Sequence, residues 1–363
     1  SWFGNNGVGY RFPVILFGTL DALLFFLIVR RIAGSAFVAA LSSSLLMVLP
    51  WFLHYSHELR GYPPYLFFVL GCYYALHGLL TDGNRLRYWA VWLISFLGCY
   101  YSNLAAIIFI FNLMVTIWIL KIGQLLWPES KRLSPLKALS LKPFLIFSSV
   151  VTAIFLYIVF VPDSWLIFKN REYQESIAKE PFFLALDIFS TYLGYTYIKD
   201  SSSMLYHYPF PLFLISLVCF LYGLGKMLKE KDFVADLFVV LFGATMIFTI
   251  MNFIQVRALV YLLPFILMFQ ALGLIGLSRI FIAKIQGEFK KENALYGVIS
   301  GVLLLYFAFL SIGKYQNLDA AAGNPYEQVR NYLEDHSGPN DLIISSIQDT
   351  ITAFYFGKII RNK

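Results

Sequence analysis

Charged side chains are scarce in this sequence, in which Asp, Glu, Lys and Arg make up 13% of 363 residues. Soluble globular domains average about 25%. Hydrophobic residues make up 59% of the chain. A soluble fold of this size could not hide so much apolar surface from water, whereas a bilayer requires it, because each spanning helix needs about 20 predominantly apolar residues. The composition therefore predicts a polytopic membrane protein.

Several familiar motifs are also missing. The sequence has no GxxxxGK[ST] phosphate loop, no GxGxxG, no GxSxG elbow and no CxxC pair. Its three cysteines, Cys72, Cys99 and Cys219, lie inside apolar runs, where a thiol behaves as a small hydrophobic group. The sequence therefore gives no support for an energy-coupled pump, a soluble-type hydrolase or a disulfide framework. Any chemistry must come from scattered polar residues.

Apolar runs of spanning length predict about ten transmembrane helices. They lie at residues 12–30, 33–53, 62–80, 88–102, 104–121, 143–162, 209–227, 233–254, 258–280 and 294–313. The run at 88–102 is short and its break from the next run is slight, so ten could be nine. We expect an all-α membrane domain over residues 12–313.

The basic residues act as topology signals. The net charge is +7, but Lys and Arg occur in short clusters between apolar runs, so no nucleic-acid-binding face is expected. Most of them fall in alternate loops, at Arg30, Arg31, Arg85, Arg87 and within 121–142, 226–231 and 279–291. The positive-inside rule makes those loops cytoplasmic. With ten spans, both ends of the chain lie at the outer face.

Three segments lie outside the predicted spans. Residues 1–11 read as the end of an outer loop, and residues 163–208 as a second outer loop that either forms an interfacial helix or lid or merely connects two spans. The tail 314–363 has a helix-like YEQVRNYLEDH followed by a strand-like LIISSI, which predicts the start of an outer α/β domain. The chain opens without Met and is expected to be a fragment of a longer protein.

The stretch HYSHELRGYPPYLFF, residues 54–68, places polar side chains between two apolar runs. If the preceding helix continues through it, His54, His57 and Glu58 share a face. These residues could bind a metal, but their spacing is not diagnostic, so a divalent metal is only a possible cofactor. Arg60 either reaches the lipid headgroups as an interfacial anchor or grips a lipid-linked phosphate through two donors. Tyr62 precedes a Pro pair that begins the next span.

Two more cations are predicted at the outer face. Arg257 precedes an apolar run, with Tyr261 one turn later on the same side, and Arg11 stands at the head of the first run. Anchoring at the headgroups is the alternative for both. Asp21 lies near the middle of a span, where we expect a structural, buried carboxyl, and Asp236 is close enough to the cytoplasmic end to reach water.

The order YSHELRGYP, then YLFFVLGCYYALHGLL, then RYWAVWLISFLGCYYSNLAAIIFIF resembles the GT-C membrane glycosyltransferases, in particular the group of dolichyl-phosphate-mannose protein mannosyltransferases and bacterial lipid A sugar transferases. WFGNNGVGYRFPVILFG, VRALVYLLPFILMFQALGL and NPYEQVRNYLEDHSGPNDLII are similar to further segments of that family.

The resemblance implies an inverting glycosyltransferase of the bacterial inner membrane, with its active face and C-terminal domain periplasmic. Its partners would be a polyprenyl-phosphate-linked sugar donor, a lipid, glycan or protein acceptor, and membrane lipids. In such enzymes a carboxylate assists the acceptor hydroxyl while cations hold the leaving phosphate. The family's catalytic Asp lies in a loop expected before Ser1, so no catalytic residue is assigned. The matching positions for substrate binding are His57, Glu58, Arg60, Tyr62, Arg257, Tyr261 and Arg11.

Two other functions are compatible with the sequence. A transporter or flippase of lipid-linked sugars would need outer-face cations too, but also polar residues deep in several spans and often inverted repeats. Mid-span polar groups are few here and no repeat is visible. A structural membrane protein of an assembly complex is the third possibility.

Overall fold

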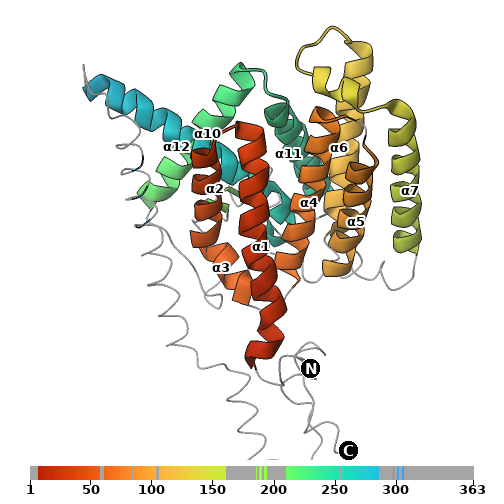
Figure 1. Cartoon of the computed structure of the whole chain (residues 1–363), viewed down its shortest axis with the longest axis horizontal. Coiled ribbons are helices and arrows are strands. Elements are labelled where there is room, and N and C mark those ends of the chain that lie inside the picture. Colours follow the sequence, from red (N-terminus) through yellow and green to blue (C-terminus); the bar gives the residue numbers. More distant parts are fainter. Residues whose placement is uncertain are drawn as a thin grey trace, which may run out of the picture. The chain divides into compact units, whose positions relative to one another are not determined.

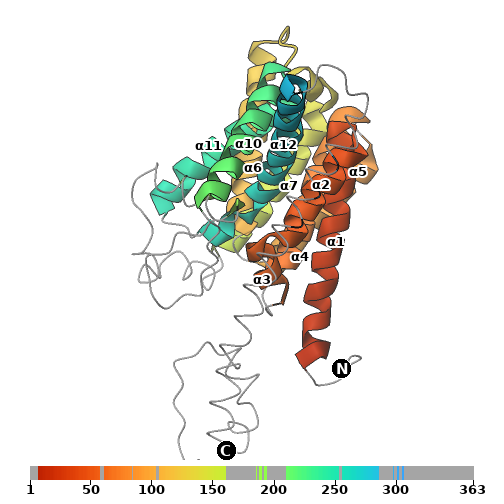
Figure 2. The same cartoon turned by 90° about the vertical axis from the view of Figure 1, so that its left-hand side faces the viewer.

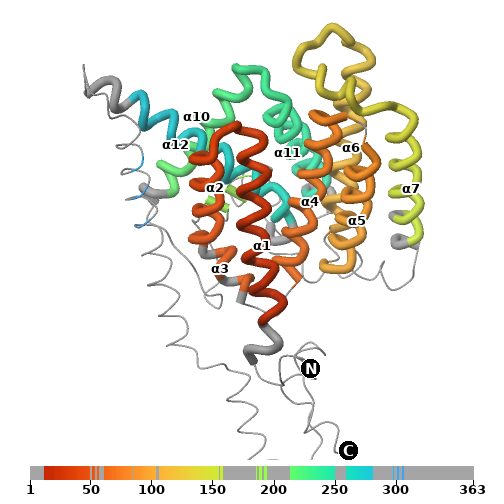
Figure 3. Tube along the Cα trace, in the orientation of Figure 1, coloured from red at the N-terminus to blue at the C-terminus, as the bar shows by residue number. Residues whose placement is uncertain are grey.

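The computed structural model describes residues 7–57, 61–83, 85–103, 106–160, 210–252 and 256–285, with isolated positions at 185–193 and 297–305. Figure 3 draws the other residues in grey. All of the described residues belong to one unit of the chain, Ser1–Ala308. Within them every regular element is a helix. The expected α/β domain at 314–363 and most of the outer loop 163–208 lie outside the described residues and stay predictions.

Ten α-helices and two short 3-10 segments make up the described chain. They are α1 (Gly7–Ala33), α2 (Ala36–Val48), α3 (Pro50–His57), α4 (Tyr62–Thr81), α5 (Leu86–Ser102), α6 (Ala106–Leu126), η1 (Ser134–Ala138), α7 (Leu141–Phe160), α10 (Phe210–Lys229), α11 (Phe233–Asn252), η3 (Val256–Leu262) and α12 (Leu263–Ile285). Figure 1 shows them as a bundle with α1 at the front and α7 at one edge.

Four stretches of the described chain are long and apolar enough to cross a membrane: Phe12–Ala33, Tyr62–Thr81, Ala106–Leu126 and Leu259–Ile280. Shorter apolar helices occur at Ala36–Val48, Leu141–Ile154 and Phe233–Thr249. The sequence prediction of a multi-pass helical protein is thus confirmed. The number of about ten spans stays a prediction, because the run at 294–313 falls almost wholly outside the described residues.

The predicted single span at 33–53 is wrong in detail. The structure divides this run into α2 and α3, with an extended residue, Leu49, between them. Pro50 explains the break, because proline has no amide hydrogen to continue the helix and disfavours helical geometry in the residue before it. The 13-residue α2 is shorter than a helix that spans the hydrocarbon core at normal incidence.

Helices α10 and α12 pack so closely that their backbones touch. They lie side by side in two views at right angles (Figure 1 and Figure 2). A Cβ added at Gly223 of α10 would overlap the carbonyl oxygen of Phe269, and one added at Gly273 of α12 would overlap that of Cys219. Small residues at such crossings allow membrane helices to associate through close van der Waals packing.

Aromatic side chains join α7 to its neighbours α5 and α6. The rings of Trp92 on α5 and Phe147 on α7 stack with centroids 4.5 Å apart, and Phe96 lies 5.6 Å from the same Phe147 ring. Trp118 of α6 contacts Phe144 of α7 at 4.8 Å. Rings at these separations contribute about 0.5–1.5 kcal/mol beyond the area they bury. They hold the peripheral α7 against the bundle.

The described loops rich in Arg gather at one end of the bundle. Arg31 at the end of α1 forms an ion pair with Asp82 at the end of α4. Arg132, in the loop after α6, donates to the carbonyl of Leu228 near the end of α10 at 2.6 Å. We call this end, formed by the last turns of α1, α4, α6 and α10, the basic end. The opposite end, with α3 and the first turn of α4, is the α3 end (Figure 1).

Candidate functional site

The stretch HYSHELRGYPP lies at the α3 end of the bundle. His54 and His57 belong to α3, so the preceding helix continues as far as His57, and Tyr62 begins α4. Gly61 caps α4, with a proline within the first two helical positions, as the Pro pair predicted. Glu58 and Arg60, and the side chain of His57, lie outside the described residues. Their part in substrate binding stays a prediction.

Four aromatic rings pack together at the α3 end, and two of them, Tyr55 and Tyr62, belong to this stretch. Trp51 and Tyr55 lie one turn apart on α3 with centroids 4.6 Å apart, and the Tyr62 ring at the start of α4 lies 4.5 Å from Tyr55 and 5.8 Å from Trp51. Tyr192, from the segment between α7 and α10, is 5.8 Å from Trp51. We call Trp51, Tyr55, Tyr62 and Tyr192 the α3 aromatic cluster. It contains one predicted site residue, Tyr62, and three that the sequence analysis did not single out.

The cluster could have been recognised in part from the sequence. Trp51 and Tyr55 are separated by four residues, which places them on one face of a helix. Tyr192 could not have been found in this way, because it lies more than a hundred residues further along the chain and the fold alone brings it to Trp51.

Gly61 fixes the chain immediately after Arg60 against α5. A Cβ at position 61 would overlap the carbonyl oxygen of Ser102 at the end of α5. Because backbone meets backbone there, position 61 tolerates no side chain without a shift of α4 or α5. The residue after Arg60 is therefore held at a defined place beside the α3 aromatic cluster.

Tyr261 lies inside the bundle, where its hydroxyl is fully hydrogen bonded. The Asn112 amide of α6 donates to the hydroxyl at 3.0 Å, and Thr245 of α11 lies 2.8 Å from it. The carbonyl of Tyr261 accepts from the hydroxyl of Tyr73 at 2.7 Å. The Tyr261 side chain has no exposed surface. These bonds join α4, α6, α11 and η3, and any contact of Tyr261 with a substrate stays a prediction.

The expectation that Tyr261 follows Arg257 by one α-helical turn is corrected by the structure. Both residues belong to the 3-10 segment η3, which is interrupted by non-helical dihedral angles at Leu259. With about 3.0 residues per turn, residues four apart in a 3-10 helix do not lie on the same side. The side chain of Arg257 lies outside the described part of the chain, as does that of Arg11, whose backbone belongs to α1.

Asp21 of α1 is completely buried, as the sequence predicted. Neither of its carboxylate oxygens has a hydrogen-bond partner among the described residues. Asp236, by contrast, is 3.5 Å from Arg132 in an ion pair at the basic end. Asp21 and Asp236 thus have different surroundings, in agreement with the depths in the membrane predicted for them.

No group of three or more His, Cys, Asp or Glu side chains with the spacing of a metal site occurs in the described part of the chain. The side chains of His54, His57 and Glu58 fall outside that part. A divalent metal at the α3 end accordingly remains a possibility raised by the sequence alone.

The arrangement of the helices has counterparts among solved structures. ArnT from Cupriavidus metallidurans bound to undecaprenyl phosphate aligns with a TM-score of 0.52 and 15% identity, over 96% of this chain and 70% of ArnT. The apo oligosaccharyltransferase of Archaeoglobus fulgidus aligns with a TM-score of 0.53 and 11% identity, over 98% of this chain. The protein has a GT-C glycosyltransferase-like fold.

The GT-C-like chain spans about half of the oligosaccharyltransferase, 53% of its length. No protein-family model and no curated protein matches the sequence. At these identities the likeness establishes the fold, and an activity has to be argued from the site. The resemblance read from YSHELRGYP is confirmed at the level of the fold.

Proposed function

We propose that the full-length protein is an inverting glycosyltransferase that moves a sugar from a polyprenyl-phosphate donor to an acceptor at the α3 end. The observation that carries the proposal is the GT-C-like arrangement of the helices, shared with an ArnT structure that contains undecaprenyl phosphate. The α3 aromatic cluster adds local support, because two of its rings, Tyr55 and Tyr62, flank in the sequence the position at which a permanent cation was predicted.

Each residue of the proposed site has a physical task. The guanidinium of Arg60 binds two oxygens of the donor phosphate and stabilises the charge that develops as the phosphate leaves. Tyr62 and Trp51 offer aromatic faces to the sugar or to the first isoprene units. Arg257 and Arg11 supply further positive charge, and His57 and Glu58 belong to the same stretch as Arg60. The carboxylate that activates the acceptor is assigned to none of the described residues.

The proposed orientation follows from the distribution of Arg and Lys. The basic end carries the cytoplasmic loops by the positive-inside rule, so the α3 end faces outward. In a bacterium this places the reaction at the periplasmic face of the inner membrane, where a lipid, glycan or protein acceptor arrives. The donor would enter from the surrounding bilayer, with its polyprenyl chain in lipid and its phosphate at headgroup depth.

Binding of undecaprenyl phosphate to the purified full-length protein tests the proposal by native mass spectrometry. We expect Arg60→Ala to weaken binding about 10- to 100-fold, because hydrogen bonds to a charged group contribute about 1.5–3 kcal/mol. The matched control is Arg85→Ala, since Arg85 precedes the first residue of α5 at the basic end, just as Arg60 lies shortly before α4. An equal loss of binding in both variants, or no loss in either, would refute the proposed site.

A second assay separates the transferase from a flippase. The protein is reconstituted into liposomes that contain a panel of polyprenyl-phosphate sugars. A transferase cleaves the donor and releases polyprenyl phosphate when a suitable acceptor is present. Movement of intact donor across the bilayer without cleavage would support the transporter instead.

A further inference from the structure

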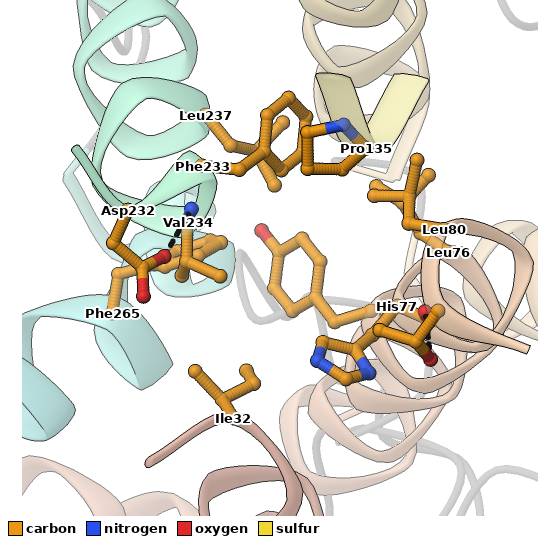
Figure 4. Close-up of a pocket in the computed structure, with 12 residues that line it drawn as sticks. Ile32, Leu76, His77, Leu80, Pro135, Asp232, Phe233, Val234, Leu237 and Phe265 are labelled. Carbon is orange, nitrogen blue, oxygen red and sulfur yellow. Dashed lines mark hydrogen bonds between the residues drawn. The ribbon is translucent and has the colours of Figure 1, made fainter. Parts of the chain in front are cut away.

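A cavity of about 240 Å³ lies at the basic end, away from the α3 aromatic cluster. It is lined by α1, α4, η1, α11, α12 and the turn before α11 (Figure 4). His77 of α4 lines it, fifteen residues after Tyr62 in the same helix. At 1.5 Å per residue this separation is about 22 Å along the helix axis. The cavity is therefore distinct from the proposed transfer site.

Most of the cavity wall is apolar, with side chains such as Ile32, Leu76, Leu237 and Phe265. Its polar lining residues are Tyr73, His77, Thr81 and Asp232, and Figure 4 shows the imidazole of His77 and the carboxylate of Asp232 on opposite sides. An apolar pocket with a few convergent polar groups is the usual form of a small-molecule site.

The Asp232 carboxylate has unused hydrogen-bonding capacity. The Nδ1 atom of His77 has no hydrogen-bond partner among the described residues either, but it is buried and does not face the cavity. One oxygen of Asp232 accepts from the amide of Val234 at 2.8 Å, and no other described residue donates to this carboxylate. The cavity thus presents the Asp232 carboxylate as an acceptor to whatever enters it.

The charges nearby leave Asp232 without a cation. Arg31 pairs with Asp82 and Arg132 pairs with Asp236. Lys226 lies 3.8 Å from Glu230, one turn away on α10. No Lys or Arg in the described chain forms an ion pair with Asp232. Burial, together with the neighbouring Glu230, raises the pKa of the Asp232 carboxyl above its ordinary value, although the Val234 amide opposes the rise.

The dimensions of the cavity limit the ligand to a small molecule. An apolar cavity of about 150 Å³ accommodates benzene. A volume of about 240 Å³ therefore suits one aromatic ring with a short alkyl tail. A cationic group on that tail would meet the carboxylate of Asp232.

We infer that this cavity binds the ammonium group and apolar body of a small amphiphilic amine. The ammonium donates to Asp232, while the body contacts the apolar wall. An anionic ligand of the same shape is repelled by Asp232, and a neutral alcohol forms the hydrogen bonds without the charge attraction. The site is independent of the proposed glycosyl transfer, because it lies at the other end of the bundle.

Three probes of matched shape test the inference: 4-phenylbutylamine, 4-phenylbutanol and 4-phenylbutyrate. Binding to the full-length protein in phosphatidylcholine nanodiscs is measured by saturation-transfer NMR, with empty nanodiscs to subtract partition into lipid. We expect the amine to bind about tenfold more tightly than the alcohol, which is the contribution of a charged hydrogen bond. We expect the butyrate to bind more weakly than either.

Asp232→Asn is the deciding variant. Asparagine still accepts from the Val234 amide and caps α11, so the helix start is preserved while the charge is removed. We expect amine binding to fall about tenfold and alcohol binding to change less than twofold. The matched control is Glu230→Gln, which removes a nearby negative charge that does not line the cavity and should leave both affinities within twofold.

Leu237→Trp fills the cavity and should abolish binding of both probes. If that variant does not fold, Asp232→Asn decides alone. Amine binding that is unchanged in Asp232→Asn, butyrate binding as tight as amine binding, or binding that survives in a folded Leu237→Trp protein would each overturn the inference.

Discussion

The contact between α10 and α12 predicts a large loss of stability when its glycines acquire a side chain. In Gly223→Ala the new methyl group would overlap the carbonyl oxygen of Phe269, and it would lie 2.9 Å from the amide nitrogen of Gly273. Backbone atoms of a packed helix cannot rotate away as the end of a flexible side chain can. The two helices must therefore separate.

The size of this effect follows from the kind of neighbour. Overpacking in a well-packed core costs about 1–3 kcal/mol, and a clash with backbone belongs at the upper end of that range. We expect about 3 kcal/mol for Gly223→Ala, a shift of about a hundredfold in the folding equilibrium. Gly273→Ala clashes with the carbonyl of Cys219 and should cost a similar amount. The double variant should cost less than the sum, because the first substitution already separates the helices.

Thermal unfolding of the detergent-solubilised full-length protein measures the effect. Gly225→Ala is the matched control on α10, because a Cβ there meets no atom within 4 Å. It should stabilise the protein by about 0.5–1 kcal/mol through the better helix propensity of alanine. Wild-type stability in Gly223→Ala, or an equal loss in Gly225→Ala, would refute the close approach of these helices.

Three further predictions concern hydrogen bonds, charge and ligand contact. Tyr261→Phe removes the acceptor of the buried Asn112 amide and should destabilise the protein by about 1–3 kcal/mol in thermal unfolding, and an unchanged stability would contradict the bond. The Arg31 guanidinium holds the pKa of the Asp82 carboxyl below its ordinary value, so Asp82→Asn should lower Tm at pH 7. That difference should narrow as the pH falls below about 4, because the carboxyl of the unfolded chain then binds a proton while the paired carboxylate of the folded protein keeps its charge to lower pH, and a difference that is constant with pH would refute the ion pair's role. Tyr62→Ala should weaken undecaprenyl phosphate binding about tenfold through loss of an aromatic face, and native mass spectrometry showing wild-type binding would remove Tyr62 from the site.

The helical, membrane-spanning class of the fold follows from composition alone, and the start of α4 follows from its Pro pair. The same reasoning missed the break before Pro50, although a proline inside an apolar run is a recognised signal for a helix boundary. The run is long enough to span, but its length does not show that Pro50 divides it.

Pairings between distant residues could not be read from the sequence. The approach of Gly223 to Gly273 depends on which helices become neighbours, and an apolar run carries no information about its partner. The same holds for Tyr192 beside Trp51. The cavity at the basic end combines His77 with Asp232, two residues that are unremarkable in their local sequence and meet only in the folded bundle.

Photo-crosslinking of a diazirine-labelled polyprenyl phosphate to the full-length protein in liposomes locates the donor directly. Peptide mapping should find the label in residues 50–66, which include α3 and the first turn of α4. Label confined to the basic end, or spread over the lipid-facing surfaces of all helices, would contradict a donor site at the α3 end.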